Sequence, residues 1–326
     1  MNLSNKYFST FASGFEPIIE DLLRQALGNV KVELLLDGLV VYTTDSTLEK
    51  VRKINFFTNS FLLLRYFPDN KAITIEKMMT AISRDNIRLS QQLQPNLRTF
   101  RVVASRENQP VPVNQKLMID VERQISRSLG MKPDRSKPQV QFWFLTRSEG
   151  FGFFGMRITQ HPDYAKVLEK GELRPEITNI LCLLSEPNRD DVFFDPFAGS
   201  GAIAKARLSF PYTKIIAGDI RPKNQHIQKV DATKLDNFDN ESIDKIVTDP
   251  PWGFFGEKIN ITDLYTKSLN SFYRVLKKDG LLVILVGDRD FFENILAKFK
   301  DKFTIKQKLY VLVSGKKAGI YKLVKI

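Results

Sequence analysis

The residues with the clearest chemistry are Asp249-Pro250-Pro251-Trp252-Gly253, directly after the apolar run Ile243 to Thr248. Two consecutive prolines stiffen a turn and remove two backbone donors, which leaves carbonyl oxygens and the Asp249 carboxylate as acceptors. An aryl-type amine is a poor nucleophile because its lone pair is delocalised into the ring. Holding its N–H bonds on Asp249 and the Pro250 carbonyl favours a geometry in which the lone pair can attack, and Trp252 offers a flat face for a base. The motif therefore predicts a site that binds and activates an amine.

A second motif, Asp195-Pro196-Phe197-Ala198-Gly199-Ser200-Gly201, follows an apolar strand predicted at Val192 to Asp195. Glycines let a backbone approach a ligand closely, and in open α/β sheets the ligand lies at the carboxyl ends of the strands. The spacing Gly199-x-Gly201-x-x-Ala204 also satisfies the dinucleotide fingerprint. An NAD-type oxidoreductase is therefore one alternative.

Two further acids follow apolar stretches. Lys214 to Asp219 reads as a strand that ends in a carboxylate able to accept both hydroxyls of a ribose. Nicotinamide dinucleotides and S-adenosylmethionine both carry such a ribose, so Asp219 does not separate them. Asp231, in Val230-Asp231-Ala232, is either an acceptor for an adenine amino group or an ordinary turn aspartate. An oxidoreductase would leave the Asp-Pro-Pro-Trp motif unexplained.

The elements that position these motifs alternate regularly from Glu172 onwards. We predict a helix at Glu176 to Leu184, a helix from Ala202, and four strands, which are Val192 to Asp195, Lys214 to Asp219, Ile243 to Asp249 and Leu281 to Val286. Strands that alternate with helices at this spacing indicate a parallel sheet covered on both faces.

The first half of the chain reads as a less regular α+β arrangement. Helices are predicted at Phe15 to Leu27, Thr74 to about Leu93 and Val113 to Leu129, where Gly130 ends the last one. Strands are predicted at Val30 to Leu34, Leu39 to Tyr42, Phe61 to Phe67, Thr99 to Ala104, Val140 to Thr146 and Phe151 to Ile158. The segment His161 to Gly171 reads as a connector.

Composition limits the function classes. A chain of 326 residues with 43% hydrophobic residues suits two domains, and no stretch is apolar for long enough to span a membrane. The N-terminus lacks the pattern of a signal peptide, so we expect a soluble, cytoplasmic protein. One cysteine, Cys182, and two histidines exclude an internal disulfide and a Cys/His zinc cluster, so no structural metal is expected.

The charge favours a polyanionic partner, because the formal net charge is +12 and the pI is about 9.5. Residues 84–147 hold twelve Lys/Arg against five Asp/Glu, whereas residues 1–83 hold nine of each. The candidate phosphate contacts are Arg98, Arg101, Arg106, Arg123, Arg127, Lys132, Arg135 and Lys137. Residues 298–326, with nine lysines and one aspartate, are either a second contact surface or a solvated edge.

Taken together, the Asp195 to Gly201 and Asp249 to Gly253 motifs resemble those of Rossmann-like RNA amino-methyltransferases. The preceding Lys170-Gly-Glu-Leu-Arg-Pro-Glu-Ile177 resembles the segment that leads into the catalytic domain in members with a THUMP RNA-binding domain, such as tRNA guanine-N2 methyltransferases. The resemblance implies a class I methyltransferase domain with a mostly parallel seven-stranded sheet at residues 161–326. It also implies a ferredoxin-like α+β subdomain at 1–70 and a THUMP-like domain at 71–160.

The resemblance further implies S-adenosylmethionine as cofactor and structured RNA, most simply tRNA, as partner. The cofactor would contact Pro175, Asp195, Phe197, Ala198, Gly199, Gly201, Asp219, Ile220, Asp231 and Ala232. The target amine would lie at Asp249, Pro250, Pro251 and Trp252 after the base is flipped out of its stack. Cys182 lies in the apolar run Ile180 to Leu184 and is expected to be a buried helical residue, which argues against cysteine-dependent methylation of a pyrimidine carbon.

Several alternatives stay open. The same chemistry fits guanine N2 in tRNA, adenine N6, or guanine N2 in ribosomal RNA, because relatives vary at the positions of Asp249 and Trp252. A non-catalytic RNA-binding protein with this fold is disfavoured by the acids retained at Asp195, Asp219 and Asp249. The modified nucleotide, the extent of methylation, the oligomeric state and any activating protein partner are not encoded in these motifs.

Overall fold

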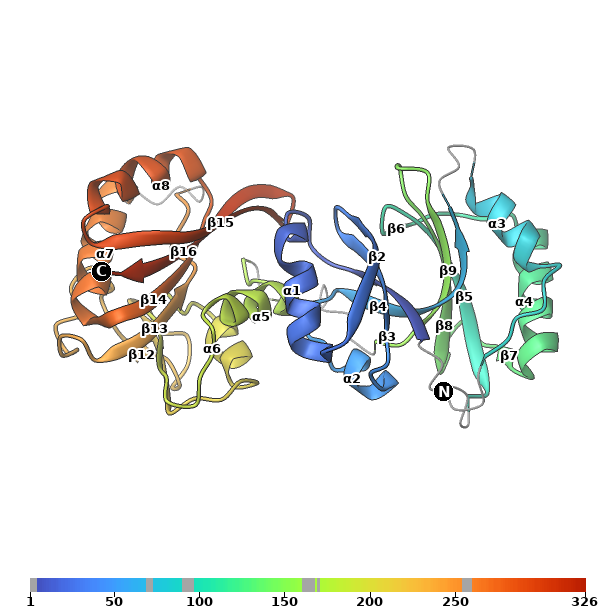
Figure 1. Ribbon diagram of the computed structural model, residues 1–326, viewed down its shortest axis with the longest axis horizontal. Coiled ribbons are helices and arrows are strands. Elements are labelled where there is room, and N and C mark those ends of the chain that lie inside the picture. Colours follow the sequence, from blue (N-terminus) through green and yellow to red (C-terminus); the bar gives the residue numbers. More distant parts are fainter. Residues whose placement is uncertain (1–4, 69–72, 90–96, 160–167, 169–170, 254–259) are drawn as a thin grey trace. The chain divides into compact units, whose positions relative to one another are not determined.

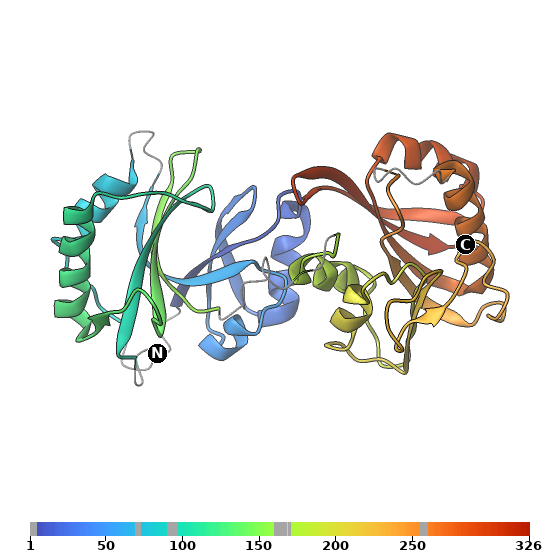
Figure 2. The same ribbon diagram turned by 180° about the vertical axis from the view of Figure 1, so that it is seen from behind.

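A computed structural model describes residues 5–68, 73–89, 97–159, 168, 171–253 and 260–326 (Figures 1 and 2). The chain divides into two compact units. The first unit is drawn from residues up to 161. The second is drawn from residues after 161, together with the segments 11–19 and 55–58. None of the described helices is long and apolar enough to cross a membrane.

The first unit is built on a nine-stranded sheet in the order β2-β3-β1-β4-β9-β8-β5-β6, with β7 also paired to β5. Its strands are β1 (Asn5–Thr10), β2 (Val30–Leu36), β3 (Leu39–Thr44), β4 (Asn59–Phe67), β5 (Thr99–Arg106), β6 (Gln109–Pro110), β7 (Lys132–Pro133), β8 (Val140–Thr146) and β9 (Gly152–Arg157). Strand β4, from the predicted subdomain at 1–70, pairs with β9, from the predicted domain at 71–160, so one sheet contains strands of both. The separation of a subdomain at 1–70 from a THUMP-like domain at 71–160 therefore stays a prediction.

Four helices accompany this sheet, namely α1 (Glu16–Leu27), whose first turn belongs to the second unit, α2 (Leu48–Arg52), α3 (Ile75–Ile82) and α4 (Gln115–Leu129). Figures 1 and 2 show α3 and α4 side by side against β5, β8 and β9. Gly152 of β9 lacks a side chain where Met78 of α3 approaches, and Gly155 lacks one where the Phe8 ring approaches. Since successive odd and even positions of a strand face opposite ways, α3 and Phe8 lie on opposite faces of the sheet.

The second unit contains a seven-stranded sheet in the order β12-β11-β10-β13-β14-β16-β15. Its strands are β10 (Val192–Asp195), β11 (Lys214–Asp219), β12 (Gln228–Lys229), β13 (Ile243–Thr248), β14 (Leu276–Val286), β15 (Phe303–Val313) and β16 (Lys316–Lys325). Strands β10 to β14 are parallel to their neighbours, whereas β16 pairs antiparallel with β14 and β15. The helices are α5 (Pro175–Leu184), α6 (Ala202–Arg207), α7 (Ile261–Val275) and α8 (Arg289–Leu296), followed by a 3-10 turn at Ala297–Phe299.

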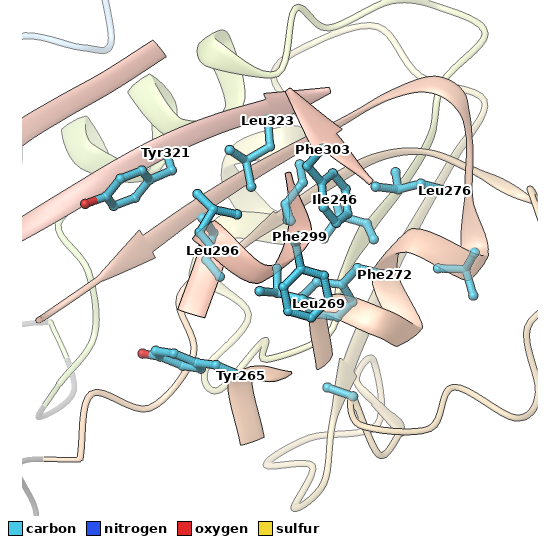
Figure 3. Close-up of a cluster of buried hydrophobic side chains, with 14 of the residues drawn as sticks. Ile246, Tyr265, Leu269, Phe272, Leu276, Leu296, Phe299, Phe303, Tyr321 and Leu323 are labelled. Atoms are coloured by element: carbon cyan, nitrogen blue, oxygen red, sulfur yellow. The ribbon is translucent and has the colours of Figure 1, made fainter. Parts of the chain in front are cut away.

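Figure 3 shows the core of the second unit, where α7, α8 and the sheet contribute side chains to one apolar cluster. Ile246 of β13 and Leu323 of β16 are fully buried with Phe272 of α7. Burial of such side chains stabilises a fold by roughly 1.5–3 kcal/mol each. The cluster includes side chains of β13, the strand that directly precedes the Asp-Pro-Pro-Trp motif.

Most predicted elements are present within a few residues, but one helix is shorter than predicted, and several elements, among them α2, α7 and α8, had no predicted counterpart. The helix predicted from Thr74 to Leu93 ends at Ile82, with Ser83 as its C-cap, and the Ser83 hydroxyl donates to the Thr80 carbonyl at 2.9 Å. Residues 83–89 are not helical, and 90–93 lie outside the described residues. Strand β1 was not predicted. The lysine-rich stretch 298–326 forms the hairpin β15–β16, of which β15 is the edge of the sheet.

Candidate active site

Three predicted acids lie at the carboxyl ends of adjacent parallel strands. Asp195 is the last residue of β10, Asp219 is the last residue of β11, and Asp249 directly follows β13. The strand order places β10 between β11 and β13, so the three acids share one edge of the sheet. This edge is where open α/β sheets bind ligands.

Asp195 is fully buried and only half satisfied. Its Oδ1 accepts hydrogen bonds from the Thr248 hydroxyl at 2.8 Å and from the Phe197 backbone N–H at 3.2 Å. Its Oδ2 has no hydrogen-bond partner among the described residues. Burial raises the pKa of Asp195 to about 7, and the charges of Asp249 and Asp219 add to that rise against the opposing hydrogen bonds. The orphaned Oδ2 is therefore an acceptor for a cationic or N–H-bearing ligand.

The glycine turn after β10 is hydrogen-bonded to the neighbouring strand β11. Gly199 has a φ of 54° and Gly201 a φ of 88°, a backbone region that other residues adopt only with strain. The Gly199 N–H donates to Asp219 Oδ2 at 2.9 Å, and the Ala198 N–H donates to the Gly218 carbonyl at 2.8 Å. A Cβ on Gly199 would meet nothing within 4 Å, so open space lies beside the turn.

Asp219 is half-buried, and each of its oxygens accepts one backbone N–H. Its Oδ1 accepts from the Arg221 N–H at 2.8 Å, and its Oδ2 accepts from Gly199. Each carboxylate oxygen has a second lone pair, so both can still accept a hydroxyl. The next residue, Ile220, is 58% exposed, which leaves an apolar side chain beside that carboxylate open to a ligand.

Asp231 and Ala232 lie just beyond β12. Asp231 Oδ1 accepts from the Thr233 N–H at 3.0 Å and the Thr233 hydroxyl at 2.6 Å. Burial alone would raise the pKa of Asp231, but the Thr233 hydrogen bonds and the charge of Lys234 outweigh it and lower the pKa. The Ala232 side chain is buried in the apolar core. The geometry of Asp231 is that of a turn aspartate, and its predicted contact with adenine stays a prediction.

The Asp-Pro-Pro-Trp turn is held by the side chains of Trp252 and Tyr265 and by the backbone at Gly287. The Trp252 indole N–H donates to Asp249 Oδ1 at 2.7 Å. The Tyr265 hydroxyl of α7 donates to the Pro251 carbonyl at 3.0 Å. A Cβ on Gly287, at the end of β14, would lie 2.6 Å from Trp252 ring atoms, so the indole packs directly on that backbone. Trp252 thus orients Asp249, a contact that the sequence-based prediction of a base-stacking ring did not include.

Asp249 itself is half-buried, and burial raises its pKa to about 7 against the opposing Trp252 hydrogen bond. Pro250 is buried and Pro251 is exposed. With Oδ1 held by Trp252, Oδ2 is the Asp249 oxygen available to an incoming amine. A carboxylate with a raised pKa is also a stronger proton acceptor than one at the surface.

Other predicted site residues lie behind this edge or in the first unit. Pro175 begins α5, and its carbonyl accepts from Thr178 Oγ1 at 3.0 Å and Asn179 Nδ2 at 2.8 Å. Cys182 of α5 is buried, as predicted, and burial raises the pKa of its thiol well above the usual range. Its Sγ lies 3.7 Å from the Ile203 carbonyl of α6, so α5 packs behind the glycine turn.

The basic residues predicted to bind RNA do not form one surface. Arg123 and Arg127 are exposed on α4, and Arg135 forms a two-oxygen ion pair with Glu122 of that helix. Arg98, Arg106, Lys132 and Lys137 are exposed at strand ends and loops. Arg101 is half-buried on β5 and pairs in register with Gln141 of β8. Phe100 and Phe142 point the opposite way and contact each other, so Arg101 lies on the face away from α3.

Three residues of the edge were not predicted. Thr248 could have been suspected, because it precedes Asp249 on an apolar strand where a hydroxyl needs a partner. Gly287 and Tyr265 lie far from the motif in the chain and reach it only through the fold.

The chain resembles known methyltransferases in both sequence and structure. Residues 162–206 and 221–316 match the model of the RMKL-like methyltransferase domain family, and Asp219 falls in the gap between them. A tRNA (guanine(6)-N2)-methyltransferase of Thermus thermophilus is 27% identical over 208 residues, which cover 57% of this chain and 62% of that protein. The chain thus aligns with less than two thirds of that relative's length.

Solved structures match over nearly the whole chain. TrmN from Thermus thermophilus gives a TM-score of 0.74 at 21% identity, covering 98% of this chain and 99% of that one. The structure of SMU.472, solved in complex with SAH, gives a TM-score of 0.65 at 15% identity, covering 99% of this chain and 98% of that one. These likenesses show the fold, and they confirm the predicted class I methyltransferase sheet. The match to the RMKL-like methyltransferase domain model lies in the C-terminal part of this chain.

Proposed function

We propose that this chain transfers a methyl group from S-adenosylmethionine to an exocyclic amine of structured RNA, with guanine N2 of tRNA as the first target. The observation that carries the proposal is the meeting of Asp195 and Asp249 at the ends of β10 and β13, each with a pKa raised to about 7. The choice of guanine N2 rests on the activity named for the Thermus relative.

The edge of the sheet suits this cofactor. S-adenosylmethionine carries positive charge on its sulfonium and its amino group, and Asp195 Oδ2 is a buried acceptor without a partner among the described residues. The open space at Gly199 leaves room for the ligand. The proposed cofactor contacts are Pro175, Asp195, Phe197, Ala198, Gly199, Gly201, Asp219, Ile220, Asp231 and Ala232. When bound, the cofactor supplies the methyl group.

Asp249 binds the target amine and receives a proton from it. Trp252 holds Oδ1, so Oδ2 accepts an N–H of the amine and fixes the direction of its lone pair. Tyr265 and Gly287 hold the Pro251 carbonyl and the Trp252 ring in place. The amine that accepts the methyl group would lose a proton, and an ionised Asp249 would take it at Oδ2.

The first unit is proposed to hold the RNA, with residues 71–160 as a THUMP-like domain. The support is the excess of twelve basic over five acidic residues at 84–147. A tRNA substrate also favours the cytoplasm as the compartment.

Incubation with radiolabelled S-adenosylmethionine and unmodified tRNA, followed by nucleoside analysis, tests the proposal. Label in N2-methylguanosine supports it. Label in N6-methyladenosine, or only in ribosomal RNA, would replace the target and keep the chemistry. Failure of the chain to bind the cofactor would refute it.

A further inference from the structure

Two arginines of the first unit lie together on the face of the sheet that is turned away from α3. Arg101 on β5 pairs in register with Gln141 on β8, and Arg157 on β9 donates from Nη1 to Gln141 Oε1 at 3.3 Å. Strands β5 and β9 flank β8, so the two arginine Cα atoms are two strand spacings, roughly 10 Å, apart. The guanidinium groups can therefore approach one small anion from two sides.

The two arginines lack a counter-charge among the described residues. Among the described residues neither forms an ion pair, and the Nε atom of each is buried without a hydrogen-bond partner. Arg147, which directly follows β8, instead forms an ion pair with Glu107 at 2.9 Å. Burial and the charge of Arg101 both lower the pKa of Arg157. Buried polar groups normally have partners, and uncompensated like charges are costly, so this pair has the character of a binding site for an anion.

An aromatic ring adjoins the pair. Trp143, two residues along β8 from Gln141, donates its indole N–H to Gln141 Oε1 at 2.8 Å, the same oxygen that Arg157 binds. The Trp143 ring is half-buried against Phe61, with ring centroids 5.6 Å apart. Gln141 thus fixes both the ring and one guanidinium, and Trp143 lies on the same face of the sheet as the two arginines.

We propose that Arg101, Arg157 and Trp143 form a nucleotide-binding site for an unpaired stretch of RNA, in which the arginines bind a backbone phosphate and Trp143 stacks on an adjacent base. This inference rests on the proposed function in taking RNA as the partner. A guanidinium matches a phosphate in planar, two-pronged geometry. A stacked base must be free of its helix, which makes a single-stranded segment the occupant.

The test compares two pairs of arginines in the full chain. Binding of a fluorescein-labelled single-stranded RNA decamer is followed by anisotropy at several salt concentrations. Arg101→Gln/Arg157→Gln is expected to lower affinity tenfold or more and to reduce the salt slope by about 0.7 for the lost phosphate contact. The matched variant Arg123→Gln/Arg127→Gln removes the same charge from α4 and should have a smaller effect. An equal or larger loss in the α4 variant would overturn the proposal.

A spectroscopic measurement covers the case in which the double variant is unstable. The chain has two tryptophans, so in Trp252→Phe protein Trp143 is the sole indole. Stacking predicts quenching of its fluorescence by the RNA decamer, and Arg157→Lys in that background should weaken binding because the ammonium lacks the guanidinium fork. Binding without quenching would overturn the stacking.

Cofactor affinity, measured by calorimetry on the native chain and on the two arginine double variants, should not change. If none of these proteins bound the cofactor, the proposed function would be refuted, but the proposed RNA site would not.

Discussion

Replacing Trp252 with phenylalanine removes one hydrogen bond from the proposed active site and keeps a flat ring over Gly287. The lost bond is the 2.7 Å contact from the indole N–H to Asp249 Oδ1, which opposes the burial that raises the pKa of Asp249 to about 7. A hydrogen bond to a charged group contributes about 1.5–3 kcal/mol, and one pKa unit corresponds to about 1.36 kcal/mol. The pKa of Asp249 should therefore rise by about one to two units in Trp252→Phe.

The higher pKa of Asp249 should change the pH dependence of the methyl-transfer rate in a defined direction. The ionised carboxylate is the form that accepts the amine N–H and the proton, so activity rises with pH through the pKa of Asp249. At pH 7 roughly half of Asp249 is ionised in the native chain, but about a tenth or less would be ionised in the variant. We expect a fivefold or greater loss of rate at pH 7 that is recovered near about pH 9.

The assay is single-turnover methyl transfer to tRNA with saturating cofactor, measured against pH for the native chain and Trp252→Phe. Trp252→Leu, which loses both the N–H and the flat ring, serves as the comparison and should be slower at every pH. If Trp252→Phe had the native midpoint, Trp252 would not tune Asp249 and the positioning role would be wrong.

Three further substitutions test other parts of the structure. Gly287→Ala places a Cβ 2.6 Å from the Trp252 ring and should destabilise the fold by about 1–3 kcal/mol while slowing methyl transfer, measured by thermal unfolding and initial rates. Asp219→Ala should weaken cofactor binding about tenfold or more by calorimetry, because it removes a charged acceptor that also holds the glycine turn; unchanged affinity would remove Asp219 from the cofactor site. Asp191→Ala leaves the fully buried Arg207 without its 2.8 Å ion-pair partner and should cost about 3–5 kcal/mol of stability in denaturant unfolding, whereas a loss below about 1 kcal/mol would contradict that account.

Local sequence patterns predicted the edge of the second sheet well. An apolar run that ends in an acid is a strand and its turn within one short stretch, and proline directly follows two of the three acids, so Asp195, Asp219 and Asp249 could be placed at strand ends without knowing the fold. The parallel order of β10, β11 and β13 then brings the acids together.

Contacts between distant segments were not predictable in this way. Nothing in the spacing of Tyr265 or Gly287 indicates that α7 and the end of β14 hold the Asp-Pro-Pro-Trp turn. The lysines of β15 and β16 obscured the alternation of buried and exposed residues in these strands, because burial on one face is set by neighbours far along the chain. Likewise, the basic residues of 98–137 were read as one cluster, and only the register of β5 with β8 shows that Arg101 faces away from Phe100.

The measurement that tests the central claim most directly compares the native chain with Asp249→Ala on unmodified tRNA and labelled S-adenosylmethionine. The native chain should label N2-methylguanosine. Asp249→Ala should lose this activity while its cofactor affinity stays within a few fold, because Asp249 acts on the amine. An Asp249→Ala protein that still methylates tRNA at the native rate would contradict the assignment of Asp249 as the amine-binding residue.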